Sequence, residues 1–85
     1  MRIELKFYGP IQDRMGGAGR SVQIAEPPAT LADLIQQLAQ TFEDSAILQA
    51  DYLRIAVNDQ LVSRHDRLDL ADGDRIAFLS PFSGG

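Results

Sequence analysis

A single amphipathic segment near the middle of the chain is the feature that most restricts the fold. Its apolar residues recur at steps of three and four, as in a helix that buries one face; they are Leu31, Leu34, Ile35, Leu38 and Phe42. Thr30, followed three residues later by Asp33, approximates a capping box at the start of this helix. Because one helix cannot cover its own apolar stripe, the segments around it must provide a sheet for it to pack on.

The N-terminal part of the chain is predicted to contain two strands. Residues 2–8 alternate between polar and apolar side chains, which places Tyr8 on the phase that faces away from the core. Gly9-Pro10 ends this strand, and we expect the glycine-rich stretch that follows to be a flexible connection. A second short strand then carries Val22 and Ile24.

A hairpin is predicted after the helix. Two interpretations stay open for residues 43–51, a loop or a short helical turn. Ser45 is suited to cap such a turn. Residues 53–57 alternate like a strand, Asn58-Asp59 favours a tight turn, and residues 61–62 make the return arm.

The last predicted strand follows the turn Asp72-Gly73-Asp74 and turns Leu79 away from the core. Leu61, in the hairpin, is also out of phase with the inward-facing Val62. Together with Tyr8, these leucines are three apolar residues expected on one exposed sheet face, converging toward the C-terminal end. Exposed apolar residues that gather in this way favour partner binding.

The order of elements predicts an α+β fold. Two strands, one main helix and two or three further strands fit the β-grasp, in which the helix crosses one face of a mixed sheet of four to five strands. The first and last strands are expected to pair in the middle of that sheet. We therefore expect one domain over residues 1–79 and a flexible tail over residues 80–85.

Length, charge and the absence of cysteine exclude several classes of function. A chain of 85 residues has one small core and little material for a deep catalytic pocket. Without cysteine it has no disulfide, thiolate metal site, iron–sulfur cluster or cysteine nucleophile. A net charge of −4 argues against nucleic acid as a partner. There is neither a long apolar run nor a signal peptide, so we expect a cytoplasmic protein without a membrane partner.

Three further features of the sequence are better explained by a structural role than by a catalytic or binding role. His65 is the only histidine and lies in a polar loop without a second group for acid–base catalysis. Residues 16–19 are rich in glycine but lack the lysine and hydroxyl residue of a phosphate-binding loop. Asp69, Asp72 and Asp74 lack the spacing of a calcium loop and are typical of turns. We therefore expect no metal or cofactor bound by this chain.

The C-terminal segment Ser80-Pro81-Phe82-Ser83-Gly84-Gly85 is the remaining candidate site. Because neither terminal glycine has a Cβ, the end of the chain can enter a channel little wider than the backbone and present its carboxylate to another protein. Pro81 fixes one dihedral and favours an extended Ser80, which reduces the entropy lost on binding. Phe82 supplies an apolar anchor. The carboxylate of Gly85 is therefore the predicted working group.

The chemistry of a carboxylate then restricts the function. It reacts with a sulfur donor only after activation to an acyl-adenylate, so a partner must use ATP to activate Gly85. Attack by the persulfide sulfur of a donor protein would give Gly85 a thiocarboxylate, which is nucleophilic at neutral pH without a local base. A carrier of this kind needs no catalytic side chain, and we do not expect the chain to be an enzyme by itself.

Three segments resemble the small subunits of molybdopterin synthase, within the ubiquitin-like sulfur carriers. They are residues 3–8, residues 57–62 with the pattern Asn-x-x-Leu-Val, and residues 72–78 with Asp-Gly-Asp, followed by the terminal Gly-Gly. The resemblance extends over essentially the whole chain. It implies that a ubiquitin-activating-type enzyme adenylates the C-terminal glycine, which then becomes a thiocarboxylate.

The resemblance also implies where the sulfur goes. The tail would enter the large subunit of a heterotetrameric synthase, whose active site lies in that subunit, and give its sulfur to cyclic pyranopterin monophosphate for the molybdenum cofactor. Gly85 would carry the sulfur and Gly84 would be its narrow neighbour. The predicted partner contacts are Tyr8, Leu61, Leu79, Pro81, Phe82, Ser83 and Gly84.

Three alternatives remain open. A sulfur carrier for the thiazole of thiamine has the same fold and the same ending, although it is usually shorter. A ubiquitin-like modifier would join Gly85 to lysines of other proteins, which is a different class of function. A plain interaction domain with incidental terminal glycines would show no modification at all. The sequence does not identify the activating enzyme or the sulfur donor.

Overall fold

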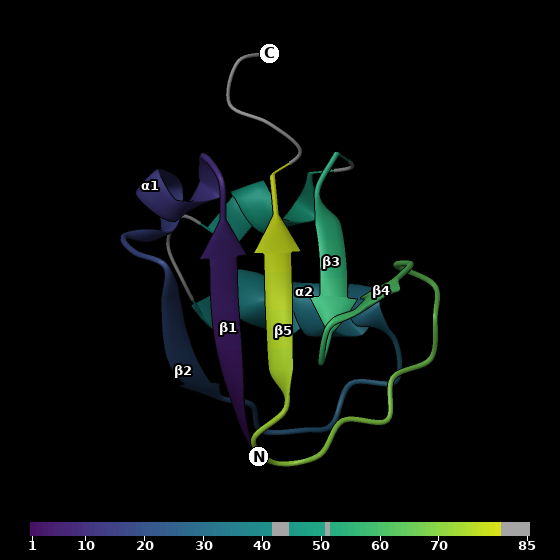
Figure 1. Cartoon of the computed structure of the whole chain (residues 1–85). Coiled ribbons are helices and arrows are strands. Elements are labelled where there is room, and N and C mark those ends of the chain that lie inside the picture. Colours follow the sequence, from purple (N-terminus) through teal and green to yellow (C-terminus); the bar gives the residue numbers. More distant parts are fainter. Residues whose placement is uncertain (42–44, 51, 81–85) are drawn as a thin grey trace.

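The computed structural model describes residues 1–41, 45–50 and 52–80. Five strands form one sheet, and one long helix lies across it (Figure 1). In chain order the elements are β1 (Arg2–Tyr8), α1 (Ile11–Met15), β2 (Gly19–Gln23), α2 (Leu31–Thr41), η1 (Ser45–Gln49), β3 (Arg54–Val57), β4 (Gln60–Val62) and β5 (Arg75–Leu79). The predicted α+β fold of the β-grasp type is confirmed.

The first and last strands of the chain lie in the middle of the sheet. The strand order is β2-β1-β5-β3-β4, so β1 and β5 are neighbours, as predicted, and the structure shows that they are parallel. The other three pairs are antiparallel. Because β1 and β5 run in the same direction, their last residues, Tyr8 and Leu79, lie side by side. The C-terminal tail therefore starts at the end of the central strand β5 (Figure 1).

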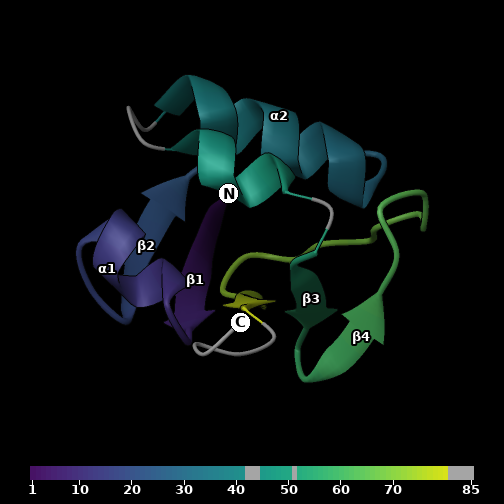
Figure 2. The ribbon, with the colours of Figure 1, turned by 90° about the horizontal axis from the view of Figure 1, so that it is seen from above.

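The core lies between α2 and one face of the sheet (Figure 2). Its largest members include Phe7 and Phe78, whose stacked rings have centroids 5.7 Å apart. From α2, the predicted apolar stripe contributes four buried residues, Leu31, Leu34, Ile35 and Leu38. Phe42, the fifth residue of that stripe, lies outside the described residues. The helical period thus predicted correctly which face of α2 packs on the sheet.

Helix α1 corrects one prediction. The stretch after Gly9 was expected to be a flexible connection, but it contains a helix of five residues. Ile11 and Met15, four residues apart, are 2% and 4% exposed and belong to the core. Gly16, with φ of 79°, ends the helix in the left-handed conformation that glycine adopts readily. Burial of this one apolar pair stabilises a helix too short to form alone.

The predicted turns agree with the structure. Asn58 and Asp59 both have positive φ, 49° and 74°, as in the two-residue turns that join antiparallel strands. The Asn58 side-chain oxygen also accepts a hydrogen bond from the Arg75 N–H at 3.0 Å, which ties the hairpin to β5. The short helical turn considered after α2 is η1, while residues 43, 44 and 51 and the side chain of Ser45 lie outside the described part.

The start of α2 is capped as the sequence predicts. Thr30 Oγ1 accepts a hydrogen bond from the Asp33 N–H at 3.3 Å. Two further N–H groups of the first turn, those of Leu31 and Ala32, donate to carbonyls of Asp66 and Arg64. The polar loop before β5 therefore serves as part of the cap.

Thr30→Ala should lower the free energy of unfolding by about 1 kcal/mol, because one N–H of the first helical turn loses its acceptor. For a domain of this size we expect the melting temperature to fall by about 4–8 °C per kcal/mol. Thermal unfolding followed by circular dichroism measures the change, and Thr30→Ser, which keeps the hydroxyl, is the control. An unchanged melting temperature in Thr30→Ala would mean that the loop carbonyls alone are sufficient.

Candidate functional site: the outer sheet face and the start of the tail

The sheet has an outer face that no helix of the described residues covers. Figure 2 shows α2 and η1 together on the opposite side. The strand register defines two rows across the outer face. In one row, Tyr8 pairs with Leu79, which pairs with Arg54. In the next row, Lys6, Ala77, Ala56 and Leu61 follow one another.

These two rows bring the three predicted contact residues onto one face. Tyr8 is 49% exposed and Leu61 is 63% exposed, whereas Leu79 is half-buried between its neighbours. Ala56 and Ala77 occupy the centre of the second row, and their small side chains separate the larger ones. We call this set of five residues the outer patch. Alternation along the last strand predicted that Ala77 faces outward, but neither alanine was predicted as a contact residue, because alanine shows no clear preference between core and surface.

Two basic residues, Lys6 and Arg54, stand in the two rows of the outer patch, although the protein carries a net charge of −4. Arg2 pairs with Glu4 at 3.7 Å, and Arg75 pairs with Asp59 at 3.4 Å. Among the described residues, neither Lys6 nor Arg54 belongs to an ion pair. These two cations flank the apolar residues and would favour a partner with an acidic rim around an apolar contact.

Ser80 is the last described residue, and it is bonded to the domain. Its N–H donates to the Tyr8 carbonyl at 3.0 Å, and its Oγ accepts from the Ile11 N–H at 3.2 Å. The predicted site residues Pro81, Phe82, Ser83, Gly84 and Gly85 lie outside the described residues. Their roles stay predictions, but the residue from which they start lies next to Tyr8 at the end of β5.

The minor candidates have structural roles where the structure describes them. His65 is exposed, and its N–H donates to Ser63 Oγ at 3.3 Å within the loop. Asp72 Oδ1 accepts from the Arg2 N–H at 2.6 Å, and Asp74 Oδ2 from the Ala71 N–H at 2.8 Å, as in ordered turns. Within residues 1–41, 45–50 and 52–80, no three acidic or histidine side chains gather to hold a metal ion.

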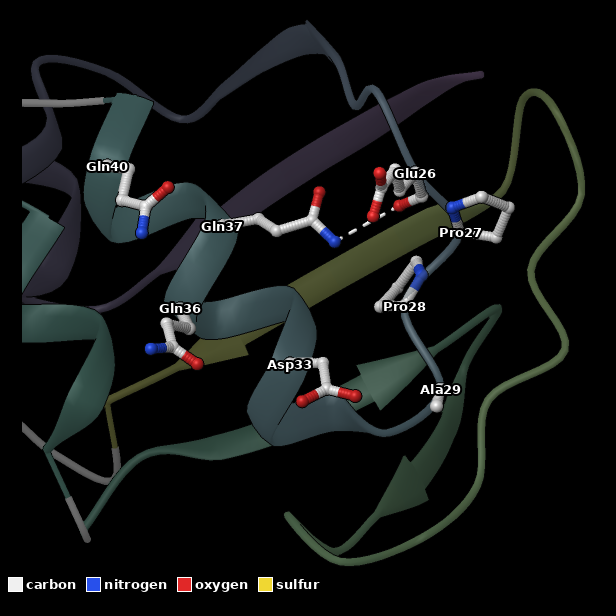
Figure 3. Close-up of a pocket in the computed structure, with 8 residues that line it drawn as sticks. All are labelled: Glu26, Pro27, Pro28, Ala29, Asp33, Gln36, Gln37 and Gln40. Atoms are coloured by element: carbon white, nitrogen blue, oxygen red, sulfur yellow. Dashed lines mark hydrogen bonds between the residues drawn. The ribbon is translucent and has the colours of Figure 1, made fainter.

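A shallow cleft of about 340 Å³ lies between α2 and the segment before it (Figure 3). Its lining is largely polar: Glu26, Pro27, Pro28, Ala29, Asp33, Gln36, Gln37 and Gln40. Gln37 Nε2 already donates to the Glu26 carbonyl at 3.0 Å. The cleft contains amides and carboxylates but no nucleophile paired with a base, so the outer patch and the tail remain the candidate site.

No helix of the described part is long and apolar enough to cross a membrane.

Several solved structures have the same fold. SAMP1 from Haloferax volcanii is similar over the whole of both chains, with a TM-score of 0.77 at 20% identity. SAMP1 from Methanosarcina acetivorans has a TM-score of 0.68 at 16% identity and covers 99% of this chain and 96% of its own. The complex of subunits 1 and 2 of molybdopterin-converting factor from Helicobacter pylori 26695 contains a chain that is 28% identical over both full lengths, with a TM-score of 0.65. No curated protein matches the sequence significantly.

The β-grasp fold and the family match together define the class of this protein as a ubiquitin-like sulfur carrier. The chain belongs to the ThiS family, which it matches over residues 5–85. The match includes the terminal Gly84-Gly85.

Proposed function

We propose that this chain is the sulfur-carrier subunit of a molybdopterin synthase. The observation that carries the proposal is the outer patch, which lies beside the start of the tail and has no partner within the described chain. The Helicobacter pylori chain of 28% identity, which was solved in a complex of two subunits, supports a large subunit as the partner that would cover this patch. Docking there would bring the tail of this chain into the large subunit.

The reaction begins at the Gly85 carboxylate. An oxygen of the carboxylate attacks the α-phosphorus of ATP in a ubiquitin-activating-type partner, and pyrophosphate leaves. The terminal sulfur of a donor persulfide then attacks the acyl-adenylate, and AMP leaves. A thiol cleaves the resulting acyl disulfide, which releases the thiocarboxylate and leaves the new disulfide on the donor side. The ATP and both protein partners belong to this proposal, and this chain supplies only the acyl group.

Delivery of the sulfur requires a second partner. In the large subunit, the thiocarboxylate sulfur attacks a carbon of the pyranopterin precursor and displaces an oxygen substituent from it. Hydrolysis of the thioester formed regenerates the Gly85 carboxylate and leaves the sulfur on the pterin. This chain contributes binding energy through the outer patch and reach through the tail, while the catalytic side chains belong to the large subunit. Lys6 and Arg54 beside the patch favour an acidic rim on that subunit.

The likeness to SAMP1 is a likeness of fold, so it does not separate a synthase subunit from a protein modifier. The final acceptor of the activated glycine separates them. Transfer of sulfur to a pterin supports the synthase subunit, transfer to a thiazole precursor supports the thiamine carrier, and an isopeptide bond from Gly85 to protein lysines supports the modifier.

Incubation with the activating enzyme, ATP and a persulfide donor should increase the intact mass by about 16 Da, because sulfur replaces one carboxylate oxygen. Fragmentation by tandem mass spectrometry should locate the added mass on Gly85. A variant that lacks Gly84 and Gly85 is the control and should gain nothing. If the shortened variant shows the same mass gain, the carrier mechanism is wrong.

A further inference from the structure

Ser80 joins the end of β5 to the start of α1. Its hydroxyl oxygen accepts a hydrogen bond from the Ile11 N–H at 3.2 Å, across 69 residues of sequence. Pro10, at the N-cap of α1, makes no side-chain cap hydrogen bond. Ser80 therefore supplies from a distant strand the acceptor that a capping residue normally supplies locally. The first residue of the predicted tail is thus bonded to the domain.

Gly9 provides the space for this contact. Its φ is +84°, and a Cβ at this position would lie 3.1 Å from both the Cβ and the carbonyl oxygen of Ser80. Left-handed backbone and close packing both favour glycine here. The Ser80 N–H also donates to the Tyr8 carbonyl at 3.0 Å. Tyr8, Gly9 and Ile11 therefore hold Ser80 in one place, which we call the Ser80 anchor.

We propose that Ser80 is a positioning residue that sets the point from which the tail delivers Gly85; this inference rests on the proposed function. Five residues follow the anchor, and an extended chain spans at most about 3.3–3.6 Å per residue, so Gly85 reaches roughly 17 Å from Ser80. Tyr8 belongs to the outer patch and contacts the anchor through its carbonyl. Docking of the patch therefore also sets the distance from the docked surface to the carboxyl carbon of Gly85.

Release of the anchor changes this distance. Without the bond from the Ile11 N–H, Ser80 would be held only through its own N–H, and the carboxylate of Gly85 would be delivered from a less fixed point. It would then spend less time at the nucleotide of the activating enzyme. The contacts of the outer patch would remain, so docking and delivery respond differently to the same substitution.

The test measures adenylation by the purified activating enzyme, followed as ATP–pyrophosphate exchange. For Ser80→Ala we expect kcat to fall about tenfold while KM for the carrier changes less than about twofold, because docking is intact and the carboxylate is misplaced. Ser80→Thr keeps the hydroxyl and should restore kcat. Gly9→Ala should reproduce the defect, because its Cβ displaces Ser80 from Ile11.

A second measurement separates positioning from folding. Two chains truncated after residue 80 are compared, one with Ser80 and one with Ser80→Ala. They should bind the activating enzyme equally tightly, because the hydroxyl of Ser80 is not part of the outer patch. Weaker binding of the truncated Ser80→Ala chain, or a wild-type kcat in full-length Ser80→Ala, would overturn the proposal. If the unmodified protein supports no exchange, the proposed function is wrong, and this inference is refuted with it.

Discussion

Gly84→Val should lower the rate of sulfur transfer by at least about 100-fold and leave the melting temperature within a few degrees of the wild-type value. Valine restricts the backbone and adds a branched isopropyl group where glycine has no side chain, so entry into a narrow channel fails for both entropic and steric reasons. The buried residues of the described structure all precede Leu79, so a change at residue 84 leaves them intact. Thermal unfolding and sulfur transfer to the pterin precursor are measured on the same preparation.

The control for this prediction is Gly84→Ala, which adds one methyl group without branching and should retain intermediate activity. Full turnover by Gly84→Val would contradict the narrow channel. A large fall in melting temperature would mean instead that the terminal glycines pack in the domain.

Leu61→Asp should weaken binding to the large subunit by roughly 100-fold, about 3 kcal/mol, because docking would bury an unpaired carboxylate within the contact. Leu61 is 63% exposed on β4, so the free protein keeps its fold. Titration calorimetry with the large subunit measures the affinity, and circular dichroism checks the fold.

The matched control is Gln23→Asp, which adds a similar charge on the same phase of the sheet but on the distant edge strand β2. Its affinity should equal that of the wild type. Leu79→Asp should weaken binding as Leu61→Asp does, with a moderate loss of stability because Leu79 is half-buried. Unchanged affinity in both leucine variants would show that the partner docks elsewhere, and an unfolded Leu61→Asp would place this residue in the core.

The periodic segments were predictable because local spacing is enough to orient them. The stripe that begins at Leu31 defined the buried face of α2, and alternation placed Phe7 and Phe78 inward. The turn at Asn58-Asp59 followed from residues that tolerate positive φ. In each case the physical cause lies within a few neighbouring residues.

Helix α1 was not predictable in this way. Its five residues offer only two apolar positions, Ile11 and Met15, and the surrounding glycines favour a loop. The helix forms because the core accepts both side chains and because Ser80 bonds to the Ile11 N–H. Both stabilising contacts come from elements distant in sequence, and helical propensity is a weak guide for so short a segment.

The amino-acid sequence by itself predicted the class of chemistry: without cysteine or a recognised catalytic set, it left the carboxylate of the terminal Gly84-Gly85 as the proposed working group. It also determined that Tyr8, Leu61 and Leu79 point away from the core. Only the tertiary structure decided that Tyr8 and Leu79 are direct neighbours and that Ser80 is bonded beside them. The reason is that strand register depends on pairing between segments about 70 residues apart, which no local pattern encodes.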